Sequence, residues 1–60
     1  MSIYVELNGD RVNYAVAVVL MDDDLREELH LDLAPCTEQE FLDAYAEAHK
    51  AKYGEEFSVQ

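Results

Sequence analysis

Hydrophobic and polar residues alternate at the start of the chain, which is the pattern of a β-strand with one buried face. Residues 3–7 read IYVEL, so every second side chain is aliphatic. Asn8-Gly9 follows directly, and this dipeptide favours a type I′ hairpin turn, because both central positions of that turn need a positive φ. We therefore predict a strand over about residues 2–7 and a tight hairpin after it.

The next segment, residues 11–20, predicts a second strand. It reads RVNYAVAVVL, is rich in valine and contains no glycine or proline. A two-residue loop would place Glu6 opposite Arg11 and Val5 opposite Val12, so that opposite charges and apolar side chains meet across the hairpin. A helix competes for this segment, because apolar residues also recur there at helical spacing. The β-branched content and the Asn-Gly turn favour the strand.

Three aspartates, Asp22 to Asp24, interrupt the apolar pattern, and strict alternation returns at residues 29–33, LHLDL. The alternation predicts a third strand over about residues 28–33, paired antiparallel with the second. Residues 25–28 fit this pattern poorly. They form either the start of the strand or a helical turn capped by the aspartates, and the sequence leaves that choice open.

Residues 38–53 predict the best specified element, a long helix. Thr37 can cap its N-terminus, Glu40 can complete a capping box, and Gly54 is placed to end it in the left-handed conformation. One broad face of the helix is apolar and would cover the sheet. The sequence thus predicts one α+β domain over residues 1–60: a three-stranded antiparallel meander, the helix packed on one face and a short extended C-terminal tail.

The charge of the chain narrows the choice of partner. The 60 residues carry 14 acidic side chains and four basic ones, for a formal net charge of −10 at pH 7. Direct binding to DNA, RNA or anionic lipid depends on lysine and arginine contacts with phosphates, so this balance argues against it. A protein with a basic surface is the natural partner. The competing interpretation is that the charge only keeps a small protein in solution, and composition does not decide between the two.

The sequence offers little for catalysis or metal binding. Cys36 is the one cysteine, which excludes an intramolecular disulfide and a zinc site built from several cysteines, and its role stays open. His30 and His49 have no nucleophile or orienting acid at a recognisable spacing. The aspartates at 22–24 lack the ligand spacing of a calcium loop. We therefore expect no enzyme activity, no cofactor and no metal site.

Three features predict where the protein resides. The longest apolar run, Tyr14 to Met21, is far shorter than the roughly 20 residues that a membrane-spanning helix needs. The N-terminus lacks the basic and apolar regions of a secretory signal. An unpaired cysteine favours a reducing compartment. Together they predict a soluble cytoplasmic protein that does not contact a membrane.

These exclusions leave the surface as the functional part of the molecule. Carboxylates three or four residues apart on a helix lie about 5 to 6 Å apart along its axis, a spacing that can follow a phosphate backbone. We predict a non-enzymatic acidic protein-interaction module that acts as a nucleic-acid mimic and blocks the basic surface of a nucleic-acid-binding protein. The predicted partner-binding residues are Asp22, Asp23, Asp24, Glu40, Asp43 and Glu47.

A second hypothesis is a small structural or assembly protein that forms a homodimer through its open sheet face. A contiguous apolar patch on that face would mark the interface. An accessory subunit of a larger complex is a third interpretation, and it predicts the same acidic contact surface. The predicted dimer face comprises Tyr4, Ala15, Ala17, Val19 and Met21.

Overall fold

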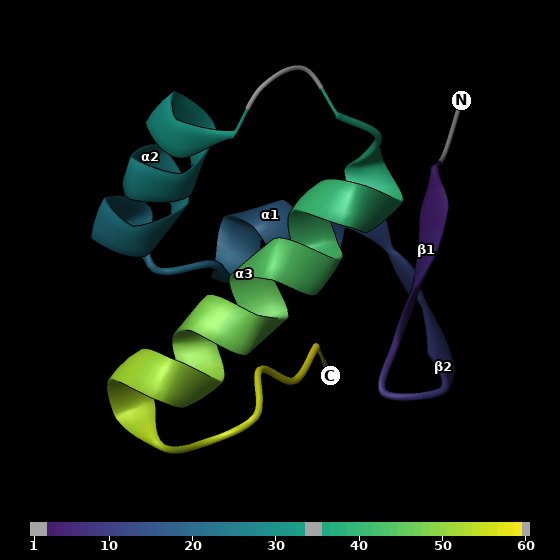
Figure 1. Cartoon of the computed structure of the whole chain (residues 1–60). Helices are drawn as coiled ribbons and strands as arrows, with labels where there is room; N and C mark the ends of the chain where they lie inside the picture. Colours follow the sequence, from purple (N-terminus) through teal and green to yellow (C-terminus); the bar gives the residue numbers. More distant parts are fainter. Residues whose placement is uncertain (1–2, 34–35, 60) are drawn as a thin grey trace.

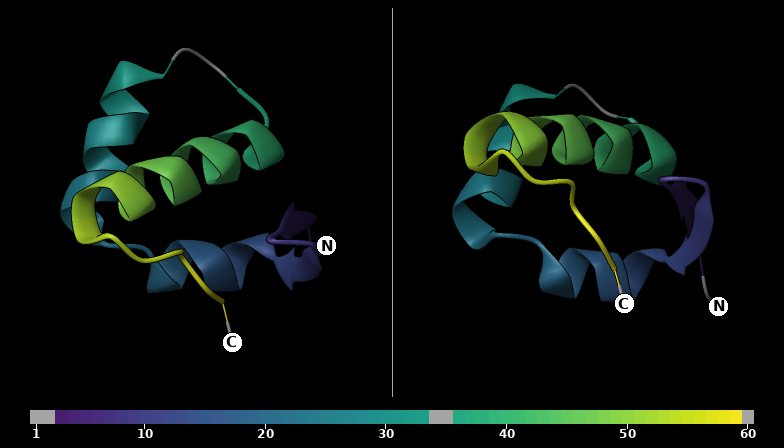
Figure 2. Two further views of the ribbon diagram at one scale, coloured as in Figure 1. Left: turned by 60° about the horizontal axis from the view of Figure 1, so that its bottom comes forward. Right: turned by 90° about the horizontal axis from the view of Figure 1, so that it is seen from below.

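A computed structural model describes residues 3–33 and 36–59 of the chain. In these residues two strands and three helices follow one another. Figure 1 shows the long α3 across the molecule, and Figure 2 shows that α3 and α1 lie on opposite sides, with α2 at one end and the hairpin at the other. No helix in the described ranges is long and apolar enough to cross a membrane. The elements are β1 (Tyr4–Leu7), β2 (Asp10–Asn13), α1 (Tyr14–Leu20), α2 (Asp23–Asp32) and α3 (Glu38–Tyr53).

The hairpin of β1 and β2 forms in the predicted register. Val5 pairs with Val12 and Glu6 with Arg11 in an antiparallel arrangement. Asn8 and Gly9 in the turn have φ values of 53° and 85°, so both occupy the left-handed region that the type I′ turn requires. Residue 2, where the first strand was predicted to begin, lies outside the described residues.

The outer edge of β1 is covered by a side chain of α3. The Gln39 amide oxygen accepts a hydrogen bond from the Glu6 N–H, and the Gln39 amide nitrogen donates to the Glu6 carbonyl, both at 2.8 Å. A neighbouring strand would satisfy the same two backbone groups. This pair of bonds also fixes the start of α3 against the hairpin.

The predicted second strand over residues 11–20 is wrong beyond Asn13, where the chain turns into α1. The Asn13 side chain caps the helix, because its Oδ1 accepts hydrogen bonds from the N–H groups of Ala15 and Val16 at 2.9 and 3.3 Å. Ala17 and Met21, four residues apart, are then buried with 0% and 4% of their surface exposed. The helical spacing that competed with the strand therefore describes this segment, and valine content did not decide it.

The predicted third strand over residues 28–33 is also wrong, because residues 23–32 form α2. Asp22 caps this helix, with its Oδ2 accepting from the Leu25 N–H at 3.1 Å. Leu25, Leu29 and Leu33 are spaced at one helical turn and pack into or against the core. Residues 25–28, left open by the sequence, are helical. The described part of the chain therefore has a two-stranded hairpin and three helices in place of a meander covered by one helix.

The helix predicted over residues 38–53 is confirmed as α3. Thr37 and Glu40 form the capping box, with the Glu40 N–H donating to the Thr37 hydroxyl at 3.1 Å and the Thr37 N–H donating to the Glu40 carboxylate at 3.2 Å. Gly54 has φ 74° and ends the helix in the left-handed conformation. Both ends are thus set by contacts local to the sequence.

Every element contributes to a single core. The C-terminal tail also takes part, because Phe57 is buried and its ring meets the Tyr45 ring edge-on, with 4.8 Å between centroids. Figure 2 shows this tail running back from the end of α3 towards α1. The buried side chains are Val5, Leu7, Ala17, Met21, Leu25, Phe41, Leu42, Tyr45 and Phe57.

A polar contact, which we call the Asp22 clasp, joins α3 to the junction of α1 and α2. The Asp22 N–H donates to the Tyr45 hydroxyl at 2.7 Å, and the Asp22 carboxylate lies 3.7 Å from the Lys52 Nζ. The hydrogen bond from the Leu25 N–H holds the pKa of the Asp22 carboxyl below its ordinary value, and the Lys52 ammonium acts in the same direction. The clasp is defined by Asp22, Tyr45 and Lys52.

Leucine-to-alanine substitutions on α2 distinguish its helical spacing from a strand. Leu25 is 5% exposed, so we expect Leu25→Ala to lower the free energy of unfolding by about 2 to 5 kcal/mol. Leu31 is 79% exposed and should change it by less than about 0.5 kcal/mol when replaced by alanine. Urea denaturation followed by circular dichroism measures both. An alternating strand would bury Leu31 together with Leu25 and Leu29, so a large cost at Leu31 would contradict the helix.

The Asp22 clasp predicts a specific sensitivity to acid. Because the pKa of Asp22 is lowered in the folded protein, its carboxylate stabilises the fold fully above the unfolded value of 3.8, and this contribution is lost as pH falls through the folded value. Asp22→Asn keeps a good capping residue but does not titrate. Urea midpoints measured from about pH 6 down to pH 2 should therefore fall less for Asp22→Asn than for the unchanged chain below about pH 4. Parallel pH profiles would contradict this role.

Candidate functional site

Three of the six predicted partner-binding carboxylates form contacts within the fold, and the other three form no ion pair among the described residues. Asp22 and Glu40 are the capping residues of α2 and α3, so their oxygens already accept backbone N–H groups. Asp23 pairs with Arg26 at 3.3 Å within α2. Asp24, Asp43 and Glu47 are exposed and take part in no ion pair among residues 3–33 and 36–59. These three remain available to a partner.

The helical form of α2 brings together three carboxylates, of which only Asp24 was a predicted partner residue. Asp24, Glu27 and Glu28 are exposed and lie three to four residues apart, so they share one side of the helix. We call these three residues the α2 acidic face. Leu31 extends it by one more turn and is also exposed. Glu27 and Glu28 were not among the predicted partner residues, because residues 25–28 were left open between a strand and a helical turn, although their spacing from Asp24 was a helical signal.

A second acidic surface lies on the outer side of α3. Asp43 and Glu47 are one turn apart, so their backbone positions are separated by about 6 Å along the helix axis. Both are exposed, while Phe41, Leu42 and Tyr45 form the buried side. The Asp43 carboxylate also accepts a hydrogen bond from the Gln39 amide at 3.0 Å, which orients it. We call Asp43 and Glu47 the α3 acidic face.

The basic side chains of the described residues pair with carboxylates outside the two acidic faces or with an aromatic ring. The Arg11 guanidinium lies 4.8 Å from the centre of the Tyr4 ring, a cation–π contact. The ion pairs of the described residues join Arg26 to Asp23, Lys50 to Glu56 and Lys52 to Asp22. Each pair is at least partly exposed and contributes little to stability, but each uses one of the four cations.

The predicted dimer face does not form one surface. Tyr4, Ala15 and Val19 are exposed, whereas Ala17 and Met21 lie in the core. These residues were grouped by the alternation of a strand, and in a helix they point in different directions. The described part of the chain has no three-stranded sheet with an open face to carry that interface.

His49 lies apart from His30 and Cys36, which both line one pocket. His49 packs among the rings of Tyr45, Tyr53 and Phe57, and its Nδ1 lies 2.8 Å from the Glu55 carbonyl oxygen. His30 and Cys36 are exposed on different segments. Within the described ranges no three histidine, cysteine, aspartate or glutamate side chains gather in a way that could hold a metal ion. The described residues therefore offer acidic surfaces for binding and no group that could hold a metal ion.

Two comparisons with known proteins bear on the family of this chain. A search of curated proteins found no similar sequence. The family model of the anti-CRISPR protein AcrIC5, in contrast, matches residues 5–57. The matched segment runs from the buried Val5 to the buried Phe57 and includes β2, all three helices described above and both acidic faces. This protein therefore belongs to the AcrIC5 family of anti-CRISPR proteins.

Proposed function

We propose that the protein is a non-enzymatic inhibitor that binds a protein component of a CRISPR effector complex through its acidic faces and keeps nucleic acid from the same surface. The observation that carries this proposal is the match to an anti-CRISPR family over residues 5–57. The inhibitor would act in the cytoplasm of the cell in which the effector operates. Such effectors hold the guide RNA and the target strand in a positively charged channel, which is the kind of surface that a strongly acidic protein complements.

The charge density of the molecule supports mimicry as the mechanism. Ten net negative charges over a longest extent of 28 Å give about one charge per 3 Å. Duplex DNA carries one charge per about 1.7 Å of its axis, so the protein reaches roughly half that density. The net charge of −10 already includes the four basic side chains, so an excess of negative charge remains after their ion pairs are counted. Attraction to a basic channel is therefore expected to be strong and sensitive to salt.

The helices hold the acidic faces in place. Both α2 and α3 are capped at their N-termini, and both pack on the core through leucine or aromatic side chains. Carboxylates on such helices keep a fixed spacing before binding, which lowers the entropy lost when the complex forms. The acidic faces thus supply a pre-arranged row of charges and no reaction chemistry.

The central test is competition with DNA. Labelled target DNA is incubated with a type I CRISPR effector complex, and the protein is added at increasing concentration. We expect the shifted DNA band to disappear as the protein binds, because the two occupy the same basic surface. Raising the salt from about 50 to 200 mM should weaken protein binding several-fold or more. A complex that holds protein and DNA together would contradict mimicry while leaving binding itself intact.

Charge reversal tests which carboxylates make the contact. The variant Asp24→Lys/Asp43→Lys/Glu47→Lys removes the free carboxylates predicted from the sequence, and its affinity for the effector should fall by about tenfold or more. The matched control is Asp10→Lys/Glu55→Lys/Glu56→Lys, which changes the net charge equally and should lose less than about threefold. Surface plasmon resonance measures both affinities, and circular dichroism checks folding. Equal losses would show that net charge alone governs binding.

A further inference from the structure

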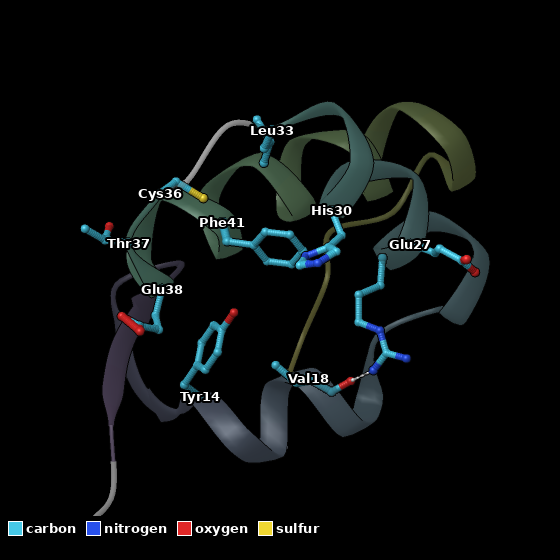
Figure 3. Close-up of a pocket in the computed structure, with 10 residues that line it drawn as sticks. Tyr14, Val18, Glu27, His30, Leu33, Cys36, Thr37, Glu38 and Phe41 are labelled. Atoms are coloured by element: carbon cyan, nitrogen blue, oxygen red, sulfur yellow. Dashed lines mark hydrogen bonds between the residues drawn. The ribbon is translucent and has the colours of Figure 1, made fainter.

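A groove opens between the three helices on the side that carries Leu33 and Cys36. It has a volume of about 830 Å³, which lies within the range of about 300 to 1,000 Å³ usual for binding pockets. Figure 3 shows its lining side chains, with Tyr14 and Val18 contributed by α1, His30 by α2 and Phe41 by α3. The groove is separate from the α3 acidic face, whose residues do not line it.

The inner wall of the groove is apolar. Val18 and Leu33 are partly buried and pack against the core, and Phe41 belongs to the core itself. The Tyr14 ring forms the opposite wall, and its hydroxyl points into the space (Figure 3). Burial and the nearby Glu38 carboxylate raise the pKa of the Tyr14 hydroxyl, so it stays a neutral hydrogen-bond donor. An apolar side chain would find contacts here that water does not supply.

The rim of the groove is negative. Glu27 and Glu38 are exposed along its two sides. Arg26 also lines it, but its guanidinium is held by the Val18 carbonyl at 3.4 Å and the Asp23 carboxylate at 3.3 Å. The rim therefore favours a cation and disfavours a phosphate, which argues against a nucleotide as occupant. It also argues against a second copy of this chain, because each copy carries a net charge of −10.

We propose that this groove receives an apolar or aromatic side chain of the CRISPR effector protein, flanked by a lysine or arginine that pairs with Glu27 or Glu38. The inference rests on the proposed function and adds a contact that nucleic acid does not make. Exposed ion pairs give little net affinity each, whereas a buried apolar anchor inside a polar rim is the usual centre of a protein interface. The acidic faces provide attraction to the basic surface, and the groove provides contact with one protein.

The single cysteine gives a direct test, because Cys36 is exposed and lines the groove. Coupling uncharged pyrene maleimide to Cys36 obstructs the groove without changing the net charge. The matched control is Cys36→Ser/Ser58→Cys with the same label, since Ser58 is exposed on the C-terminal tail. We expect the label at position 36 to weaken effector binding by about tenfold or more and the label at position 58 by less than about threefold. A small S-methyl group on Cys36 should have no such effect.

Circular dichroism checks that each labelled protein remains folded. Comparing the effector affinities of Cys36→Trp and Cys36→Ser repeats the test without a label, because tryptophan obstructs the groove and serine does not. Equal affinity of all folded forms would overturn the groove contact and leave the proposed function intact. Failure of the unlabelled chain to bind the effector would overturn both. Sedimentation of the protein alone tests whether a second copy occupies the groove. If the protein is a dimer that the label at position 36 dissociates, and effector binding is unchanged, the occupant is a second copy and the proposal is overturned.

Discussion

Tyr45 is the residue on which the arrangement of the other segments depends. Its side chain is fully buried, its ring supports Phe57 of the C-terminal tail, and its hydroxyl accepts the backbone N–H of Asp22 between α1 and α2. One aromatic side chain thus connects α3 to the C-terminal tail and to the junction of α1 and α2. In a 60-residue chain, whose core is small, a single such connection is a substantial part of the net stability.

The parts of the fold that could be predicted are those encoded by neighbouring residues. The Asn8-Gly9 turn and the two ends of α3 each depend on side chains within a few positions of one another, and both predictions are confirmed. The segments 14–20 and 25–32 could not be decided in this way, because their apolar residues fit both a period of two and a helical turn. The two segments are helical because Asn13 and Asp22 cap them and because one side of each helix is buried in the common core. Valine-rich composition was a weaker guide than these caps.

The same ambiguity governed the functional residues. An excess of carboxylates is visible from composition, but their roles depend on the elements that carry them. Glu40 completes the predicted capping box and Asp22 caps α2, so both act in stability as well as in charge. Glu27 lies on an exposed helical side and on the rim of a groove that only the packing of three helices creates. No residue spacing in the sequence predicts that groove, because its walls come from segments far apart along the chain. The net charge and the capping role of Glu40 were therefore predictable from the sequence, whereas the positions of the other carboxylates on the surface depended on the fold.

The glutamine that covers β1 limits how this protein associates with copies of itself. An open strand edge is a template on which another chain can add a strand, and this is a common route to aggregation. The Gln39 side chain forms hydrogen bonds with the N–H and the carbonyl of Glu6, so these two groups are not free to pair with a strand of another molecule. These bonds are formed by the first turn of α3, so the edge is closed as soon as the helix docks. The protein can therefore accumulate to high local concentration around its target without intermolecular strand pairing at this position.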